Sequence, residues 1–334
     1  MTHEAGPQAA DPAHAGAVIQ PTVKSPIKPA VRLPVKQLLL VLGLVATVYA
    51  AVLLIWGDSP HASLARLWSW TGLQAAALCL LSYLLRGLRW RLWMAHFERH
   101  FGWLQGLRLY LAGYAFTPTP GNVGEALRGL LLAQQPLTPR QSLAIFGAER
   151  VADLLCLLLL CLPVLGWLFS LGVGPARPAL LLGLAAAALL LALLLGLLLL
   201  RRQMLRQRLG WLREAWQCLA LRPLLWLALT LAAWAAQGLA VWLICQELQV
   251  DIPWLTASGF YAVAMVAGAL SALPAGLGGT EAVLTGLLVA QGATAAAALT
   301  ITVLVRLLTL WLAVAIGLLA LLYSAAIRKE ISFR

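Results

Sequence analysis

Acidic residues, and charge of any kind, are scarce in this chain of 334 residues. Asp, Glu, Lys and Arg make up 11% of the sequence, and only 12 residues are Asp or Glu, whereas a soluble domain carries roughly a quarter charged residues. The sequence is instead 62% hydrophobic. Its run 179–200 offers about 20 apolar residues without a charge, which is enough to cross a bilayer. The composition excludes a soluble domain and predicts an all-α polytopic membrane protein.

Sequence features that indicate an enzyme, a metalloprotein or an outer-membrane barrel are missing. The five cysteines have no C-x-x-C spacing, and we interpret them as small core residues. His96 and His100 stand four residues apart without a third ligand nearby, so we expect no metal site. Ser271 and Thr280 lack a base that would activate them, and the strand alternation of a barrel is absent. The sequence therefore predicts no catalytic residue, no metal ligand and no cofactor, in a protein that is not an enzyme.

The net charge of +12 does not indicate a nucleic-acid partner, because the cations lie in short clusters beside the apolar runs. If both termini share one side of the membrane, nearly all of the flanking Lys and Arg residues fall on that side, Arg86 and Arg89 among them. Arg66 and Arg177 alone fall on the other side. The positive-inside rule then predicts that both termini are cytoplasmic.

The apolar runs divide the chain into a tail, six full spans and two broken stretches. Residues 1–34 are rich in Ala, Pro and Gly, which predicts a disordered cytoplasmic tail and not a signal peptide. A transmembrane domain is expected over residues 35–327, and residues 328–334 form a cytoplasmic C-terminus. Two apolar stretches, 103–133 and 254–291, are interrupted near the middle by Pro and Gly, which predicts re-entrant helical hairpins. The full spans are predicted at 37–56, 64–86, 143–171, 179–200, 223–246 and 296–326. The tryptophans expected to act as interfacial anchors near span ends are Trp56, Trp68, Trp70, Trp90 and Trp93.

The two broken stretches form an internal repeat. The segments "PTPGNVGEALRGLLL" and "LPAGLGGTEAVLTGLL" share the order proline, glycine, glycine, Glu-Ala, glycine and Leu-Leu. Arg150 follows Glu125 by 25 residues, and Arg306 follows Glu281 by 25 residues. Three predicted spans separate the repeats, which lie around 103–171 and 254–326, so the second repeat is expected to have the opposite orientation. Many alternating-access transporters are built from such inverted-topology repeats.

Helix-breaking residues gather at the tip of each predicted hairpin. Proline removes a backbone donor, and glycine permits positive φ and close backbone approach. Irregular backbone at membrane depth is tolerated only where protein or a water-filled cavity surrounds it. We therefore expect the two tips to meet near the midplane, around a polar pocket. The predicted break residues are Pro118, Pro120, Gly121, Gly124, Pro274, Gly276, Gly278 and Gly279.

Seven charged residues fall in or beside the spans and must be paired or wetted, because each costs about 2.5–3.5 kcal/mol at the bilayer centre. Pairs at i,i+3, such as Glu125 with Arg128 and Arg150 with Asp153, allow local pairing. In one interpretation the arginines only clamp the fold. In the other they bind an anionic headgroup, helped by helix N-termini after Gly124 and Gly279, and the surplus carboxylates keep the empty pocket neutral or carry protons. The seven candidates for substrate binding or translocation are Glu125, Arg128, Glu149, Arg150, Asp153, Glu281 and Arg306.

The chain resembles the lysylphosphatidylglycerol synthase transmembrane family, also called flippase-like integral membrane proteins, over about residues 37–326. The resemblance rests on "LRGLRW", "PTPGNVGEALRGLLL", "AERVADLL" and "LPAGLGGTEAVLTGLL", followed by Arg306. It implies that a polar lipid moves between leaflets, and it implies site roles for the seven charged residues. Larger members carry a soluble aminoacyl-transferring domain. Because this chain ends in "IRKEISFR", we expect no such domain and no lysyl transfer by this chain.

The leading hypothesis is a translocator that moves an anionic, aminoacylated or polyprenyl-phosphate lipid through a midplane pocket, with membrane lipid as its partner. One alternative is an ion-coupled transporter of a small solute. Another is a non-transporting membrane partner of a lipid-modifying or glycosyltransferase enzyme. The sequence leaves open the lipid, the direction, the energy source and the oligomeric state.

Overall fold

The computed structural model describes residues 60–119, 122–129, 136–170, 210–271 and 273–327, together with the isolated positions 43, 47 and 51. Within these ranges the chain is helical and contains no β-strand. The expected tail, the spans predicted at 37–56 and 179–200, and residues 328–334 lie outside the described residues. The elements in chain order are α2 (Pro60–Ala65), η1 (Arg66–Trp68), α3 (Trp70–His96), α4 (Trp103–Ala112), η2 (Gly113–Phe116), η3 (Val123–Gly129), α5 (Pro139–Ser170), α8 (Gly210–Ala220), α9 (Pro223–Glu247), α10 (Trp254–Leu270), α11 (Gly279–Ala290), α12 (Ala295–Arg306), η4 (Leu307–Trp311) and α13 (Leu312–Ala326).

The protein is an all-α polytopic membrane protein, as the composition predicts. Three helical stretches are long and apolar enough to cross a bilayer: α3, α9 and the continuous run from Ala295 to Ala326. The last two match the spans expected at 223–246 and 296–326. The helix α5 has 32 residues and covers the span expected at 143–171.

The span expected at 64–86 is displaced in the structure. The helix α3 begins after Ser69, whose Oγ accepts a hydrogen bond from the backbone N–H of Gly72 at 3.0 Å. It then continues to His96, ten residues past the expected end. The prediction ended the span at Arg86. The helix continues because Arg86 and Arg89 find partners inside the protein, which removes the reason to stop there.

Two of the tryptophans expected at the membrane interface are core residues instead. Trp90 and Trp93 are 2% and 0% exposed and pack in the main hydrophobic cluster, so the prediction for them is wrong. The Trp93 indole donates to the carbonyl of Cys218 at 2.8 Å, which meets the polar requirement of a buried indole. Trp68 and Trp70 are exposed, consistent with the prediction, and Trp56 lies outside the described residues.

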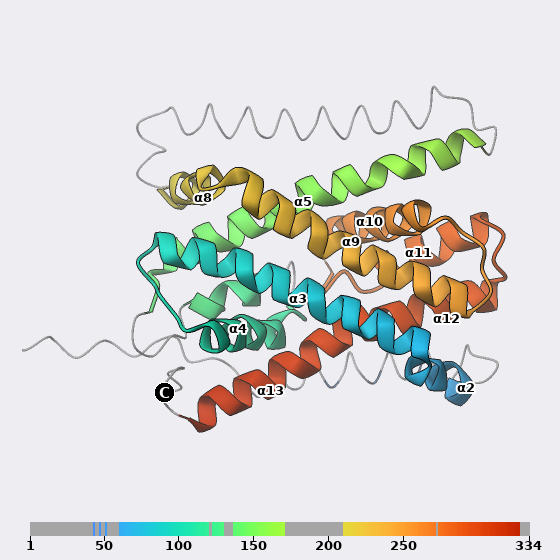
Figure 1. Cartoon of the computed structure of the whole chain (residues 1–334), viewed down its shortest axis with the longest axis horizontal. Coiled ribbons are helices and arrows are strands. Elements are labelled where there is room, and N and C mark those ends of the chain that lie inside the picture. Colours follow the sequence, from blue (N-terminus) through green and yellow to red (C-terminus); the bar gives the residue numbers. More distant parts are fainter. Residues whose placement is uncertain are drawn as a thin grey trace, which may run out of the picture.

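Helix α3 packs along α9, and α5 packs against α8, α9 and α10. Figure 1 shows that α4 lies at one end of the molecule, near the C-terminal ends of α3 and α13. The helices α10 and α11 lie at the opposite end, near the C-terminal end of α9. The stretch from α12 through α13 runs between the two ends. The two predicted hairpins therefore lie in opposite halves of the molecule.

Both apolar stretches that were predicted to be broken are broken. In the first, α4 ends at Ala112 and is followed by 3₁₀ turns, and η3 starts at Val123. In the second, α10 ends at Leu270, and α11 does not start until Gly279. Pro118 and Pro274 lie in the breaks, whereas Pro120 and Gly121 lie outside the described residues.

Two glycines at the tips meet different physical demands. Gly278 has φ of 84° and is the N-cap of α11, a backbone conformation that L side chains rarely adopt. Gly124 has no such φ, but a Cβ there would lie 2.7 Å from the carbonyl oxygen of Phe116. The first glycine is needed for the turn, and the second for the close approach of two backbone segments.

An irregular turn follows Arg306, where η4 is a π-helix of five residues inside the C-terminal span. A π-turn leaves carbonyl groups without their usual helical donors. The hydroxyl of Tyr83, on α3, donates to the carbonyl of Leu308 at 2.8 Å and lies 3.4 Å from that of Thr309. Tyr83 thus supplies from another helix a donor that the turn itself lacks.

Candidate functional site

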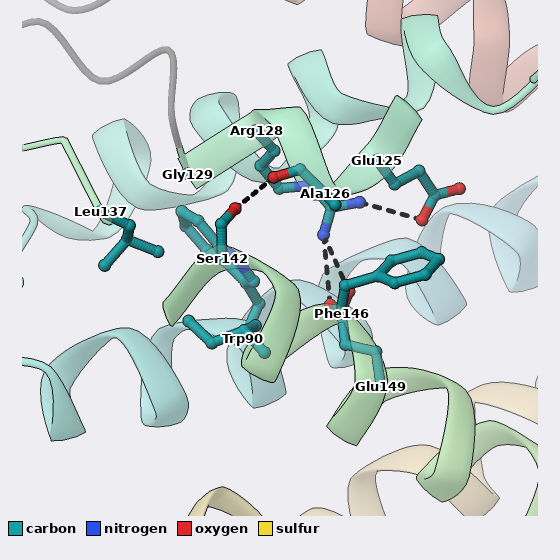
Figure 2. Close-up of a pocket in the computed structure, with 10 residues that line it drawn as sticks. Trp90, Glu125, Ala126, Arg128, Gly129, Leu137, Ser142, Phe146 and Glu149 are labelled. Carbon is teal, nitrogen blue, oxygen red and sulfur yellow. Dashed lines mark hydrogen bonds and ion pairs between the residues drawn. The ribbon is translucent and has the colours of Figure 1, made fainter. Parts of the chain in front are cut away.

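Arg128 lies between two carboxylates, on η3, just after the break in the first repeat. It pairs with Glu125, three residues earlier on η3, at 3.0 Å, and with Glu149 on α5 at 3.1 Å. Its guanidinium also lies over the ring of Tyr110, 4.5 Å from the centroid. Figure 2 shows Arg128 reaching down from η3 with both ion pairs. All three charged side chains are buried, and the cavity beside them, about 10 Å³, holds at most a single water.

Asp153 is the centre of a second group of charges. Its Oδ1 accepts from Arg89 Nη1 at 2.7 Å and from the Trp234 indole at 3.2 Å, and its Oδ2 pairs with Arg150 at 3.2 Å. Arg89 donates in addition to Thr230 Oγ1 at 2.9 Å. A buried ion pair needs additional hydrogen bonds to offset its desolvation, and here α3, α5 and α9 each contribute a partner to Asp153.

Arg150 links the two groups of charges. Its Nη2 lies 3.5 Å from Glu125 and 3.2 Å from Asp153. Its side chain is 37% exposed, whereas those of Arg89, Arg128 and Arg306 are 1–2% exposed. Arg150 is therefore the most accessible of the paired buried-span arginines, although it keeps two carboxylate partners.

In the second repeat, Arg306 ties the tip to the following span. Its Nε donates to Glu281 Oε1 at 2.7 Å, and its Nη2 donates to the carbonyl of Ala275 at 2.8 Å. The other oxygen of Glu281 accepts from the backbone N–H of Gly278 at 2.8 Å. The Glu281 carboxylate therefore caps α11 and also binds Arg306, whose guanidinium donates to the second tip at Ala275.

The 25-residue spacing in the two repeats corresponds to one kind of contact. Glu125 pairs with Arg150 at 3.5 Å, and Glu281 pairs with Arg306 at 2.7 Å. The i,i+3 pairs expected from the sequence, Glu125 with Arg128 and Arg150 with Asp153, also form. All seven predicted residues thus enter ion pairs: five belong to the two linked groups of the first repeat, and Glu281 and Arg306 pair in the second.

Side chains from both repeats line one polar cavity of about 80 Å³. Glu125 and Arg150 come from the first repeat, and Arg306 and the Ala275 backbone come from the second. Asn122, at the first tip, lines it as well. The two tips therefore meet at a polar pocket within the protein. The tyrosines that line this polar cavity are Tyr83, Tyr110, Tyr114 and Tyr261.

A larger cavity of about 350 Å³ adjoins the polar one and is mostly apolar. The two share Asn122, Arg150, Trp234, Met265 and Ala275. The larger cavity extends from these residues between α5 and α10. Its aliphatic lining consists of Leu154, Leu157, Val266, Leu270 and Leu273.

The sequence interpretation missed two residues of this site, Arg86 and Arg89. Both were assigned to the cytoplasmic surface. Arg89 instead pairs with Asp153, and Arg86 lines the polar cavity, donates to Gln237 Oε1 at 3.1 Å and stacks on Trp234 at 4.0 Å. A signal was available: the seven predicted residues held four carboxylates and only three arginines, so one carboxylate needed a cation from elsewhere.

The missed residues reverse the charge balance that the sequence suggested. The expectation of surplus carboxylates is wrong, because the cluster contains more cations than anions. No carboxylate in the described ranges lies within ion-pair distance of Arg86. The cations are Arg86, Arg89, Arg128, Arg150 and Arg306, and the carboxylates are Glu125, Glu149, Asp153 and Glu281.

The helix N-termini expected at the two tips are not equivalent. Gly124 lies inside the 3₁₀ segment η3, which is seven residues long, so no α-helix begins after it within the described residues. After Gly279 the helix α11 begins as expected, with Thr280 lining the larger cavity. Glu281 occupies the cap of that helix, which places a negative charge where an anionic ligand was expected.

Within the described ranges, no group of three or more His, Cys, Asp and Glu residues is arranged to hold a metal ion. The five cysteines are buried and free. Comparison with known families matches residues 39–317 to the family described as "Lysylphosphatidylglycerol synthase TM region". No curated protein matches the chain.

Proposed function

The chain belongs to the lysylphosphatidylglycerol synthase TM region family, and from this membership we propose that it moves an anionic lipid between the leaflets of a membrane. The family relates the protein to the synthesis or translocation of membrane lipid. Translocation requires a site that receives a charged headgroup inside the membrane. The polar cavity, where the two repeats meet, is our candidate for that site.

The observation that carries the proposal is the excess of positive charge at the polar cavity. Arg86, Arg150 and Arg306 all line it, and Glu125 is the one carboxylate among its lining residues. Charged groups within a membrane are costly and default to functional sites. Arginine is also well suited to phosphate, since its planar fork donates to two oxygens at once.

We propose further that the two hairpins form an inverted repeat of re-entrant elements. Their location in opposite halves of the molecule supports this proposal. Inverted repeats place the substrate site near the midplane and allow it to open alternately to either side. We place both termini on the cytoplasmic side of a bacterial inner membrane, following the distribution of Lys and Arg along the sequence.

The larger apolar cavity favours a lipid over a small solute as the substrate. It adjoins the polar cavity, and Leu270 on its lining is 82% exposed on the outer surface of the helices. A hydrocarbon chain has an apolar place to lie there while its headgroup is among the arginines. A polar solute would make no hydrogen bonds to these aliphatic side chains. We therefore propose a lipid translocator and not an enzyme or a solute carrier.

The test is leaflet exchange of fluorescently labelled lipids in proteoliposomes that contain the purified full chain. A membrane-impermeant quencher reports the fraction of each lipid that has crossed. We expect exchange of anionic lipids, and a loss of about tenfold or more for Arg150→Ala. Arg140→Ala is the matched control, because Arg140 forms an exposed ion pair with Glu214 outside both cavities.

Absence of exchange for every anionic lipid would rule out the translocator. If Arg150→Ala leaves the rate of exchange unchanged, the polar cavity is not the site of transport. If Arg150→Ala left exchange intact but abolished the activity of a lipid-modifying enzyme in the same membrane, the protein would be a partner of that enzyme.

A further inference from the structure

We propose that the substrate is a lipid whose headgroup is a bare phosphate, such as phosphatidic acid or a polyprenyl phosphate, and that aminoacylated lipids are excluded. The phosphate binds in the polar cavity between Arg86, Arg150 and Arg306, and the hydrocarbon chain lies in the adjoining apolar cavity. This inference rests on the proposed function and narrows its substrate.

Unused donors at the polar cavity call for an acceptor. The Nε atoms of Arg86 and of Arg150 are buried and have no hydrogen-bond partner. Arg86 has Gln237 and the face of Trp234 as its partners, and neither carries a charge. A buried donor without an acceptor is unfavourable, and phosphate oxygens are the strong acceptors that a guanidinium fork fits.

The size of the polar cavity limits what accompanies the phosphate. Its volume of about 80 Å³ accommodates a few water molecules, which is space for one tetrahedral oxyanion. A lysyl or sugar group attached to the phosphate would have to extend into the apolar cavity. Most of the side chains there are aliphatic, Leu154, Leu157 and Leu270 among them, and the one carboxylate in the lining, Asp153, already pairs with Arg89 and Arg150. An ammonium group would therefore find no unpaired carboxylate in this cavity.

Charge excludes the aminoacylated lipid as well. Lysylated phosphatidylglycerol carries two ammonium groups and one phosphate, so its net charge is positive. The cluster already contains one more cation than carboxylates, and Arg86 is the cation without a carboxylate partner in the described ranges. A cationic headgroup would add like charge in a medium of low dielectric constant. An anionic phosphate instead neutralises the excess positive charge of the cluster.

The apolar cavity has the position required for a lipid chain. It begins at Arg150 and Asn122, which it shares with the polar cavity, and lies between α5 and α10. Its volume is about 350 Å³. Its far lining includes Leu270, at the exposed end of α10. An amphiphile with its phosphate at Arg150 thus has its chain directed along aliphatic side chains toward the outer surface.

The experiment measures binding of four probes to the purified full chain in detergent by isothermal titration calorimetry. The probes are phosphatidic acid, lysylated phosphatidylglycerol, inorganic phosphate and a long-chain alcohol without phosphate. We expect phosphatidic acid to bind at least tenfold more tightly than each of the others. Inorganic phosphate tests a free anion as the ligand, and the alcohol tests the hydrocarbon alone.

Two variants assign the two halves of the lipid to the two cavities. Arg86→Gln removes the unpaired charge and is expected to weaken the binding of phosphatidic acid at least tenfold. Arg86→Lys is expected to retain part of the affinity. Ala269→Trp fills the apolar cavity, which Ala269 lines, and is expected to weaken phosphatidic acid without changing the weak binding of inorganic phosphate. The matched controls are Arg140→Gln and Ala290→Trp, which lie outside both cavities. Gel filtration and thermal unfolding confirm that each variant is folded.

The outcomes separate this inference from the proposed function. Equal or tighter binding of the lysylated lipid overturns the inference, and so does an unchanged affinity of Arg86→Gln for phosphatidic acid. Inorganic phosphate that binds as tightly as the lipid identifies a free anion as the ligand and overturns it too. Selective binding of phosphatidic acid without leaflet exchange supports the inference but overturns the translocator. Leaflet exchange of the lysylated lipid alone overturns the inference but supports the translocator.

Discussion

Arg306 and Glu281, on α12 and α11, form an ion pair at 2.7 Å. The corresponding pair in the first repeat, Arg150 and Glu125, is longer at 3.5 Å, and its arginine is more exposed. Arg306 also holds the Ala275 carbonyl at the second tip. The two arginines therefore have unequal environments despite their equal sequence spacing, and different consequences of substitution follow for each.

Substitution of Arg306 by methionine is expected to destabilise the protein by about 3 kcal/mol, because it leaves Glu281 and the Ala275 carbonyl without their donor. The measurement is chemical unfolding in detergent, followed by circular dichroism. Arg140→Met, which breaks an exposed pair with Glu214, should change the free energy of unfolding by less than about 1 kcal/mol. Similar losses in both variants would contradict a clamping role for Arg306.

The buried pair of Arg89 and Asp153 should show strong coupling in a double-mutant cycle. Arg89→Met removes the 2.7 Å partner of Asp153 and is expected to lower the melting temperature clearly. The double variant Arg89→Met/Asp153→Leu removes both charges and should recover more than half of that loss. Scanning fluorimetry measures these two variants and the single variant Asp153→Leu, and additive losses would show that the pair is not coupled.

Arg150 is expected to matter more for transport than for stability. Its side chain is 37% exposed, so Arg150→Gln should shift the melting temperature by only about 2 °C, while leaflet exchange falls about tenfold. Arg128→Gln offers the opposite case, because Arg128 is buried between two carboxylates and its loss should destabilise the fold. Equal destabilisation by the two substitutions would contradict this division.

Gly268 and Gly286 provide a matched pair of alanine substitutions in the second repeat. A Cβ at Gly268 would overlap Thr280 Oγ1, whereas a Cβ at Gly286 would meet no atom within 4 Å. Gly268→Ala is expected to separate α10 from α11 and cost about 1–3 kcal/mol. Gly286→Ala is expected to stabilise α11 by up to about 1 kcal/mol, because alanine has the higher helix propensity. Thermal unfolding of both variants checks the difference in sign.

The sequence predicts the fold class, the breaks and two of the ion pairs because these depend on local pattern. Glu125 with Arg128 and Arg150 with Asp153 are one helical turn apart, and the 25-residue spacing marks a Glu and an Arg that recur in both repeats. The contact between Glu149 and Arg128 was not predicted. Arg86 and Arg89 were not predicted as site residues, since a cation at the end of an apolar run is equally typical of a cytoplasmic flank. Their partners, Gln237 and Asp153, are far along the chain.

The 3₁₀ conformation of η3 and the burial of Trp90 also depend on tertiary packing. Gly124 lies against the carbonyl of Phe116, so the returning segment adopts the tighter helix that this close approach allows. Trp90 contacts Phe101 and Tyr110 through its ring, and these neighbours come from the segments that follow α3. Nothing in the local sequence specifies either contact.

The hydrogen bond from Tyr83 to the carbonyl of Leu308 has a consequence for the order in which the protein is made. The two residues are 225 positions apart, so the turn obtains this donor from a helix that lies far earlier in the sequence. Because synthesis proceeds from the N-terminus, the helix that carries Tyr83 leaves the ribosome long before the π-turn does. We therefore expect the last span to form its irregular turn against a helix that has already been made.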